Sequence, residues 1–157
     1  RVPATILGII AMNDPKLAAA VINSSDNPKQ FAGILDLLIE TKDSNGAWSD
    51  ATMTKVFSAL NLNSSNVVEI MQNMKPQNVA VVLNIIAIDP DDVVACGYVA
   101  QALMATNDPQ FIASVLGSTE WGSGRVPATI LGIIAMNDPK LADAVINDWM
   151  LNLVEIH

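Results

Sequence analysis

Residues 1–23 read RVPATILGIIAMNDPKLAAAVIN, and residues 125–147 repeat that stretch as RVPATILGIIAMNDPKLADAVIN. The two copies differ at a single position, where Ala19 of the first copy corresponds to Asp143 of the second. Agreement this close indicates a duplication, because chance does not reproduce a stretch of such length. The period runs from position 1 to position 125 and is therefore 124 residues long. The chain is thus predicted to have a repeat architecture.

Each copy is predicted to fold as two helices joined at a sharp corner. An Asp-Pro pair divides the stretch, at Asp14-Pro15 in the first copy and at Asp138-Pro139 in the second. An aspartate accepts hydrogen bonds from the free N–H groups of a first helical turn, and a proline at the first helical position loses no hydrogen bond. The residue before a proline is pushed out of the α region, so the same pair also ends the preceding helix. Further corners of this kind lie at Asn27-Pro28, Asp89-Pro90 and Asp108-Pro109.

These corners divide the chain into short helices. In the segment that begins at Pro28, the apolar residues fall on one helical stripe, which consists of Phe31, Ile34, Leu35, Leu38 and Ile39. No segment alternates apolar and polar residues over enough positions to propose a strand. Helices are predicted near residues 3–12, 15–23, 28–41, 50–60, 64–73, 76–87, 90–105, 109–116, 127–136 and 139–156.

Several of these helices are apolar nearly all round. The stretch ILGIIAM at residues 6–12 is the clearest case. A helix of this kind is buried on more than one side, so it must lie between neighbouring helices. Short helices, sharp corners and sandwiched helices together predict an all-α fold, an α-solenoid or right-handed α-superhelix of about ten short helices.

One helical-repeat domain is predicted over residues 1–147, consisting of one unit and the start of a second copy at residue 125. Beyond this point the second copy diverges, and DWMLNLVEIH at residues 148–157 replaces the SSDNPKQFAG that follows the first copy. Trp149 and Met150 continue an apolar stripe there. An altered terminal repeat is typical of the cap on a stacked array, so residues 148–157 are predicted to be a divergent C-terminal capping segment.

The duplication leads to two structural expectations. Both copies should form the same helix pair with the same neighbours, because their sequences and apolar faces are the same. The side chain of Asp143 should be exposed to solvent or lie near a cation, since burying an unpaired carboxylate costs several kcal/mol.

Composition excludes several classes of protein. The chain has 157 residues, of which 51 % are hydrophobic and 15 % charged, and this balance excludes intrinsic disorder. Sixteen acidic residues against eight basic ones give a net charge of −8, which argues against nucleic acid and anionic membrane surfaces as partners. No apolar run reaches the ~18–20 residues of a membrane helix, so no membrane insertion and a soluble protein are predicted.

Residues 74–103, MKPQNVAVVLNIIAIDPDDVVACGYVAQAL, contain a proline, a helix, a second proline corner and another helix. Through Met74, Pro76, Ala80 and Leu83 the segment resembles the M-x-P-x-x-x-A-x-x-L superhelix of MgtE-type magnesium transporter cytoplasmic domains and of flagellar motor-switch proteins. The resemblance implies stacked short helices that serve regulation and protein contacts. It carries over no functional residue, since the acidic residues with which those transporters bind regulatory magnesium have no counterpart here.

Residues suited to catalysis are few. His157, the only histidine, is the last residue of the sequence and is interpreted as a solvated chain end. Cys96, the only cysteine, has Val94, Ala95 and Gly97 as neighbours, none of which lowers the pKa of a thiol. It is therefore interpreted as a small buried apolar residue, and no catalytic site is predicted.

Two acidic groups are candidate metal sites. Asp43, Asn45 and Asp50 offer oxygen ligands in one loop, but their spacing does not follow that of a calcium-binding EF-hand. That loop is interpreted as a polar turn. A second group consists of Asp89, Asp91 and Asp92, which lie at the N-terminus of a predicted helix. Capping of that helix accounts for all three, so no metal site and no cofactor are predicted.

Methionine and tryptophan leave two interpretations open. The methionines at positions 12, 53, 71, 74, 104, 136 and 150 fit core filling, or an adaptable groove for a peptide or lipid. Trp48 and Trp121 lie on loops, where each could anchor a partner or fold back over the end of the helix stack.

The sequence therefore predicts a non-enzymatic structural or protein-interaction module from a tandem helical-repeat protein. The uncovered ends of a repeat predict self-association, by end-to-end stacking or by exchange of residues 1–23 and 125–147 between chains. A carrier that binds an apolar ligand or peptide between its helices is the alternative. A carrier should show a cavity on the order of several hundred Å³ lined by methionine and leucine, whereas a structural module should be packed solid.

Overall fold

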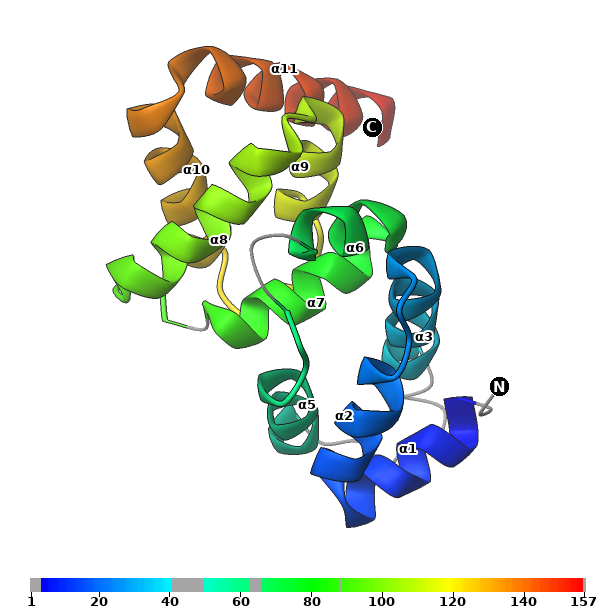
Figure 1. Ribbon diagram of the computed structural model, residues 1–157. Coiled ribbons are helices and arrows are strands. Elements are labelled where there is room, and N and C mark those ends of the chain that lie inside the picture. The colour runs from blue at the N-terminus through cyan, green and yellow to red at the C-terminus, as the bar shows by residue number, and fades with distance from the viewer. Residues whose placement is uncertain (1–3, 41–49, 63–65, 88, 157) are drawn as a thin grey trace. The chain divides into compact units, whose positions relative to one another are not determined.

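The computed structural model describes residues 4–40, 50–62, 66–87 and 89–156, and within these ranges the chain is helical, with no strand. The prediction of an all-α fold is confirmed (Figure 1). Contacts divide the chain into two compact units, residues 1–75 and residues 76–157. The helical-repeat domain over residues 1–147 stays a prediction. The α-superhelix is an arrangement of the helices of both units, and it stays a prediction.

The first unit contains five of the described helices. These are α1 (Ala4–Asn13), α2 (Pro15–Asn23), α3 (Pro28–Glu40), α5 (Asp50–Ser58) and α6 (Val67–Asn73). Helices α1 and α2 pack against each other and against α3 and α5, and α3 also packs against α6. The side chain of Asn23 ties the end of α2 to the segment after α5. Its Nδ2 donates to the carbonyl oxygen of Ala59 (3.1 Å), and its Oδ1 accepts from the N–H of Asn61 (2.8 Å).

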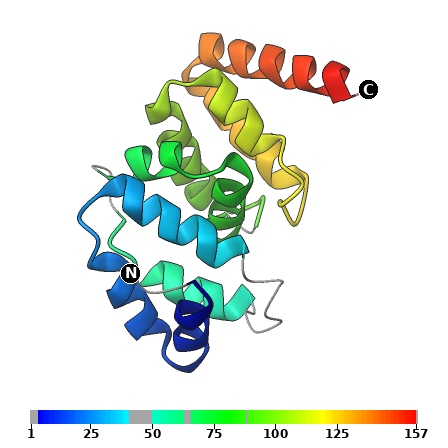
Figure 2. The same cartoon turned by 90° about the vertical axis from the view of Figure 1, so that its right-hand side faces the viewer.

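The second unit contains the remaining described helices. These are α7 (Pro76–Ile86), α8 (Val93–Thr106), α9 (Pro109–Leu116), α10 (Arg125–Asn137) and α11 (Pro139–Ile156). Helix α10 packs against α8 and α9, and α11 packs against α9 (Figure 2). Helix α11 runs to Ile156 without a break, so residues 148–156 of the predicted capping segment continue the second copy's last helix.

The proline corners form as the sequence predicts. The carboxylates of Asp14, Asp108 and Asp138 each accept a hydrogen bond from the backbone N–H three residues later, all at 3.1 Å. Each of these bonds satisfies a donor that a first helical turn leaves free. The helix starts at Pro15, Pro109 and Pro139 therefore follow directly from the sequence.

The corner at Asp89-Pro90 is an exception. The predicted helix over residues 90–105 begins instead at Val93, and Asp92 is its N-cap residue. The carboxylate of Asp92 accepts from the N–H of Ala95 at 3.1 Å, so the cap lies three residues beyond the site that the proline marks. Two candidate caps lie close together here, and the structure uses the second of them.

Both copies of the repeated stretch form a helix pair, as predicted. We call α1–α2 the N-terminal pair and α10–α11 the C-terminal pair. Their partners differ. The N-terminal pair packs against α3 and α5, which follow it in the chain, whereas the C-terminal pair packs against α8 and α9, which precede it.

Candidate functional site

The repeated helix pair buries a different side in each unit. In the C-terminal pair Ile130 and Leu141 are only 0 % and 7 % exposed, and Ile134 and Val145 are also buried. We call these four positions, and their equivalents Ile6, Ile10, Leu17 and Val21 in the first copy, face A. In the N-terminal pair face A is only partly covered. Ile6 is 50 % exposed and Leu17 is 51 % exposed, while Ile10 and Val21 are half-buried.

The N-terminal pair buries the neighbouring side instead. Its buried residues include Leu7, Ala11, Ala19 and Ile22. We call these positions, and their equivalents Leu131, Ala135, Asp143 and Ile146, face B. In the C-terminal pair Ala135, Asp143 and Ile146 are exposed, and Leu131 is half-buried. One amino-acid sequence therefore packs through face A in the second unit and through face B in the first.

In the first helix of the pair the two faces are related by a rotation of one residue, whereas in the second helix face B lies one or two positions after face A. Ile6 and Ile10 belong to face A, and Leu7 and Ala11, one position later, belong to face B. One residue turns an α-helix by about 100°, so the two faces of the first helix lie on adjacent sides, and those of the second helix also point in different directions. The expectation that both copies have the same neighbours is wrong. A helix that is apolar nearly all round does not select one side, and the surrounding helices decide which side is buried.

The one difference between the copies follows this change of partner. Ala19 is 1 % exposed in the first unit, whereas Asp143 is exposed, in agreement with the prediction from the sequence. A carboxylate at position 19 would lie in the core of the first unit. At position 143 it is in contact with solvent and costs nothing.

The C-terminal pair has one further contact, beyond the end of the repeat. Gly117 is the C-cap residue of α9, and the indole of Trp149 in α11 lies against it. A Cβ placed on Gly117 would be 3.2 Å from Nε1 of Trp149, so a larger residue there would crowd the ring. Position 25, the equivalent of Trp149 in the first copy, is a serine. The contact is therefore specific to the C-terminal pair.

The residues considered for nucleophilic chemistry are not arranged for it. Cys96 is fully buried in α8, and its Sγ donates to the carbonyl oxygen of Asp89 at 3.8 Å. Burial raises the pKa of the Cys96 thiol, and the nearby carboxylates of Asp92 and Asp89 raise the pKa further. This environment favours the unreactive thiol over the thiolate. His157 lies outside the described residues.

The acidic residues before α8 act in local structure. Asp92 caps the helix, and the carboxylate of Asp89 accepts from the N–H of Asp91 at 2.9 Å. Asp91 forms an exposed ion pair with Arg125 of α10 at 3.3 Å, and such pairs contribute little to stability. Among the described residues no group of three acidic, histidine or cysteine side chains could hold a metal ion. Asp43 and Asn45 lie outside the described residues, and Asp50 begins α5.

The methionines divide between the interior and the surface. Met53, Met71 and Met74 are buried, in agreement with core filling. Met12 and Met136, which are equivalent positions of the repeat, are both exposed, as is Met150.

The two loop tryptophans have different outcomes. Trp121 is buried, and its Nε1 donates to the carbonyl oxygen of Val115 at 2.9 Å. It therefore covers the end of α9, and its interpretation as an exposed binding anchor is wrong. Trp48 lies outside the described residues.

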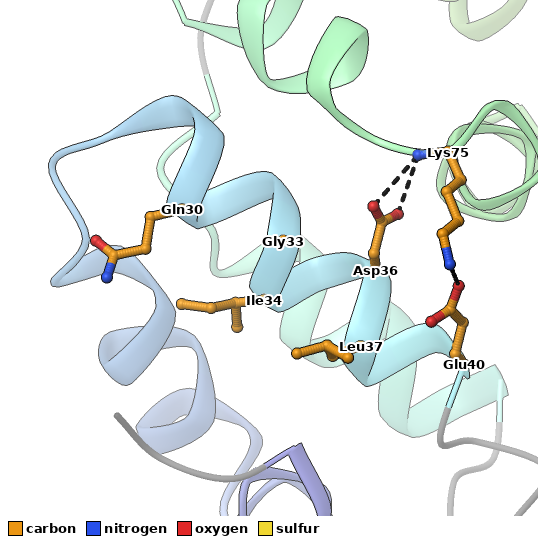
Figure 3. A pocket seen from close by; sticks show the side chains of 7 residues that line it. All are labelled: Gln30, Gly33, Ile34, Asp36, Leu37, Glu40 and Lys75. Carbon is orange, nitrogen blue, oxygen red and sulfur yellow. Dashed lines mark hydrogen bonds and ion pairs between the residues drawn. The ribbon is translucent and has the colours of Figure 1, made fainter.

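A pocket of about 360 Å³ lies along α3 in the first unit (Figure 3). The residues that line it are Gln30, Gly33, Ile34, Asp36, Leu37, Glu40 and Lys75. The N–H of Lys75 donates to both carboxylate oxygens of Asp36, at 3.2 and 3.3 Å, and the Lys75 ammonium pairs with Glu40. The hydrogen bond to Glu40 and the charge of that carboxylate raise the pKa of Lys75. The pocket wall thus combines charged residues that bind one another with the aliphatic side chains of Ile34 and Leu37.

No protein-family model, curated protein or solved structure matches the chain. The resemblance of residues 74–103 to the superhelix of transporter and motor-switch proteins stays a prediction about architecture. In the part of the chain that the structure describes, no helix has both the length and the apolar character to span a membrane.

Proposed function

We propose that this chain is a non-enzymatic structural module of a tandem helical-repeat protein, in which the repeated helix pair connects successive modules. The pair belongs to two modules at once. It contacts α8 and α9 of the module before it through face A, and α3 and α5 of the module after it through face B.

The observation that carries this proposal is the change of buried face between the two copies. The N-terminal pair has a following module and buries face B. The C-terminal pair has a preceding module and buries face A. Both faces of residues 1–23 are apolar, as an internal copy of the pair would need, and this accounts for helices that are apolar nearly all round.

The side chains considered for catalysis support a module without enzymatic activity. Cys96 is buried as a thiol, and the carboxylates of Asp89 and Asp92 accept backbone hydrogen bonds. The carrier of an apolar ligand is the alternative function. The pocket along α3 gives it little support, because three charged residues line that pocket and no methionine does.

Extension of the chain tests the proposal. Residues 76–124 placed directly before Arg1 give the N-terminal pair a preceding module, with the same connection that joins residue 124 to Arg125. We expect face A to become covered and the amide hydrogens of residues 4–23 to exchange more slowly than in the original chain. Hydrogen exchange followed by mass spectrometry measures this, through peptides that carry either Ala19 or Asp143 and so distinguish the two copies.

The Leu17→Asp variant of the extended chain is the matched control, because Leu17 belongs to face A and is half exposed in the original chain. The slower exchange should disappear in this variant. Equal exchange rates in the original and the extended chain would refute the connector function.

A further inference from the structure

We infer that the surface formed by α8 and α9 is a binding site for residues 1–23 of a second copy of this chain. The N-terminal pair of the second copy binds there through face A, in the position that residues 125–147 occupy. This inference rests on the proposed function and names the partner of the uncovered face.

Identity of sequence provides the complementarity. The α8–α9 surface covers Ile130, Ile134, Leu141 and Val145, and all four residues recur unchanged as Ile6, Ile10, Leu17 and Val21. In the first unit this same set is only partly covered. A surface that fits one copy of the pair therefore fits the other, and the second chain has that copy available to solvent.

Binding does not require the second copy to unfold. Its N-terminal pair is held on α3 and α5 through face B, and face A points in a different direction, about 100° away in the first helix. The pair can contact both surfaces at once. The result is a head-to-tail contact, from the first unit of one chain to the second unit of another.

Position 143 gives the contact a direction. The N-terminal pair has Ala19 at the equivalent position. An alanine fits the core of the first unit, and it is also tolerated on the second unit, where this position is exposed. The C-terminal pair has Asp143, which would be buried if that pair replaced residues 1–23 on α3 and α5. Residues 1–23 can therefore occupy either surface, whereas residues 125–147 are restricted to α8 and α9.

The tethered C-terminal pair competes with the second copy for the same surface. A short connection gives a tethered segment an effective concentration on the order of millimolar. Trp149, against Gly117, adds a contact that residues 1–23 lack. The original chain therefore binds a second copy weakly, and loosening the C-terminal pair should strengthen that binding.

A test with donor and acceptor chains isolates this contact. The acceptor is the full chain with Leu141→Asp, which loosens its C-terminal pair, and Leu17→Asp, which disables its own face A. The donor is the original chain, and the matched control donor carries Leu17→Asp alone. Aspartate at position 17 or 141 suits the first turn of its helix, so each substitution acts on burial rather than on helix formation.

We expect sedimentation velocity to show a 1:1 complex of acceptor and original donor. The control donor should bind at least about tenfold more weakly, since the burial of one leucine changes an association constant by that factor or more. A second acceptor carries Ile134→Asp in place of Leu141→Asp. It covers the case in which one of these substitutions unfolds the second unit. The inference is overturned if neither acceptor binds the donor, or if both donors bind equally.

The outcome is independent of the test of the connector function. Slower exchange in the extended chain together with no donor–acceptor complex would leave the connector function standing and refute capture of a second copy. Unchanged exchange in the extended chain would refute the connector function itself.

Discussion

At the scale of single residues, Ala19 and Asp143 show how one position distinguishes two otherwise identical copies of the repeated stretch. The sequence alone predicts that Asp143 is exposed, because a buried carboxylate without a partner is costly. It does not predict that Ala19 is buried, since the two copies were expected to share their neighbours. The structure places the alanine in a core and the aspartate in solvent.

Exchanging these two residues should therefore have unequal effects. Ala19→Asp buries a charge in the first unit and should lower the free energy of unfolding by about 3 kcal/mol or more. Asp143→Ala changes an exposed helix position and should alter it by less than about 0.5 kcal/mol. Urea unfolding followed by circular dichroism measures both. Equal effects of the two substitutions would mean that the copies do not differ in burial at this position.

At the scale of elements, the sequence predicts helix positions well where a cap and a proline coincide. The starts at Pro15, Pro109 and Pro139 are examples. The start of α8 was misplaced because both Asp89 and Asp92 can cap, and nothing local ranks them. The buried side of α1 could not be predicted from its composition. Isoleucine or leucine occupies positions on both faces, so only the packing of α3 and α5 decides between them.

The contact between Trp149 of α11 and Gly117 at the end of α9 is also not predicted from the sequence. A methyl group on Gly117 would lie 3.0 Å from the carbonyl oxygen of Ala113 and 3.2 Å from Nε1 of Trp149. Gly117→Ala should therefore destabilise the second unit by roughly 1 kcal/mol through overpacking. Gly124→Ala is the control, because nothing lies within 4 Å of its added carbon. Urea unfolding should separate the two variants, and identical midpoints would exclude the close approach of Trp149.

At the scale of the whole molecule, the helical pattern predicts the all-α fold and the repeat predicts association, but neither identifies the surface that associates. That surface follows from comparing burial in the two copies. This surface, face A, consists of apolar side chains, whereas the chain as a whole carries a net charge of −8. Two copies therefore repel each other at long range and attract only through close contact of apolar side chains.

This combination predicts an unusual dependence on salt. Raising sodium chloride from about 0.05 M to about 0.5 M screens the repulsion between like-charged chains and leaves apolar burial in place. The association of donor and acceptor should therefore strengthen with salt, as sedimentation velocity can measure. Weaker association at high salt would indicate that opposite charges, rather than face A, hold the two chains together.

The central claim is that one sequence buries face A in the second unit and face B in the first, and matched leucines test it most directly. The measurement is the free energy of unfolding of Leu17→Asp and of Leu141→Asp, each relative to the original chain. Leu141 is 7 % exposed, so its replacement should cost about 2–5 kcal/mol. Leu17 is 51 % exposed, so its replacement should cost less than about 1 kcal/mol. Equal losses in the two variants, or a larger loss for Leu17→Asp, would contradict the account.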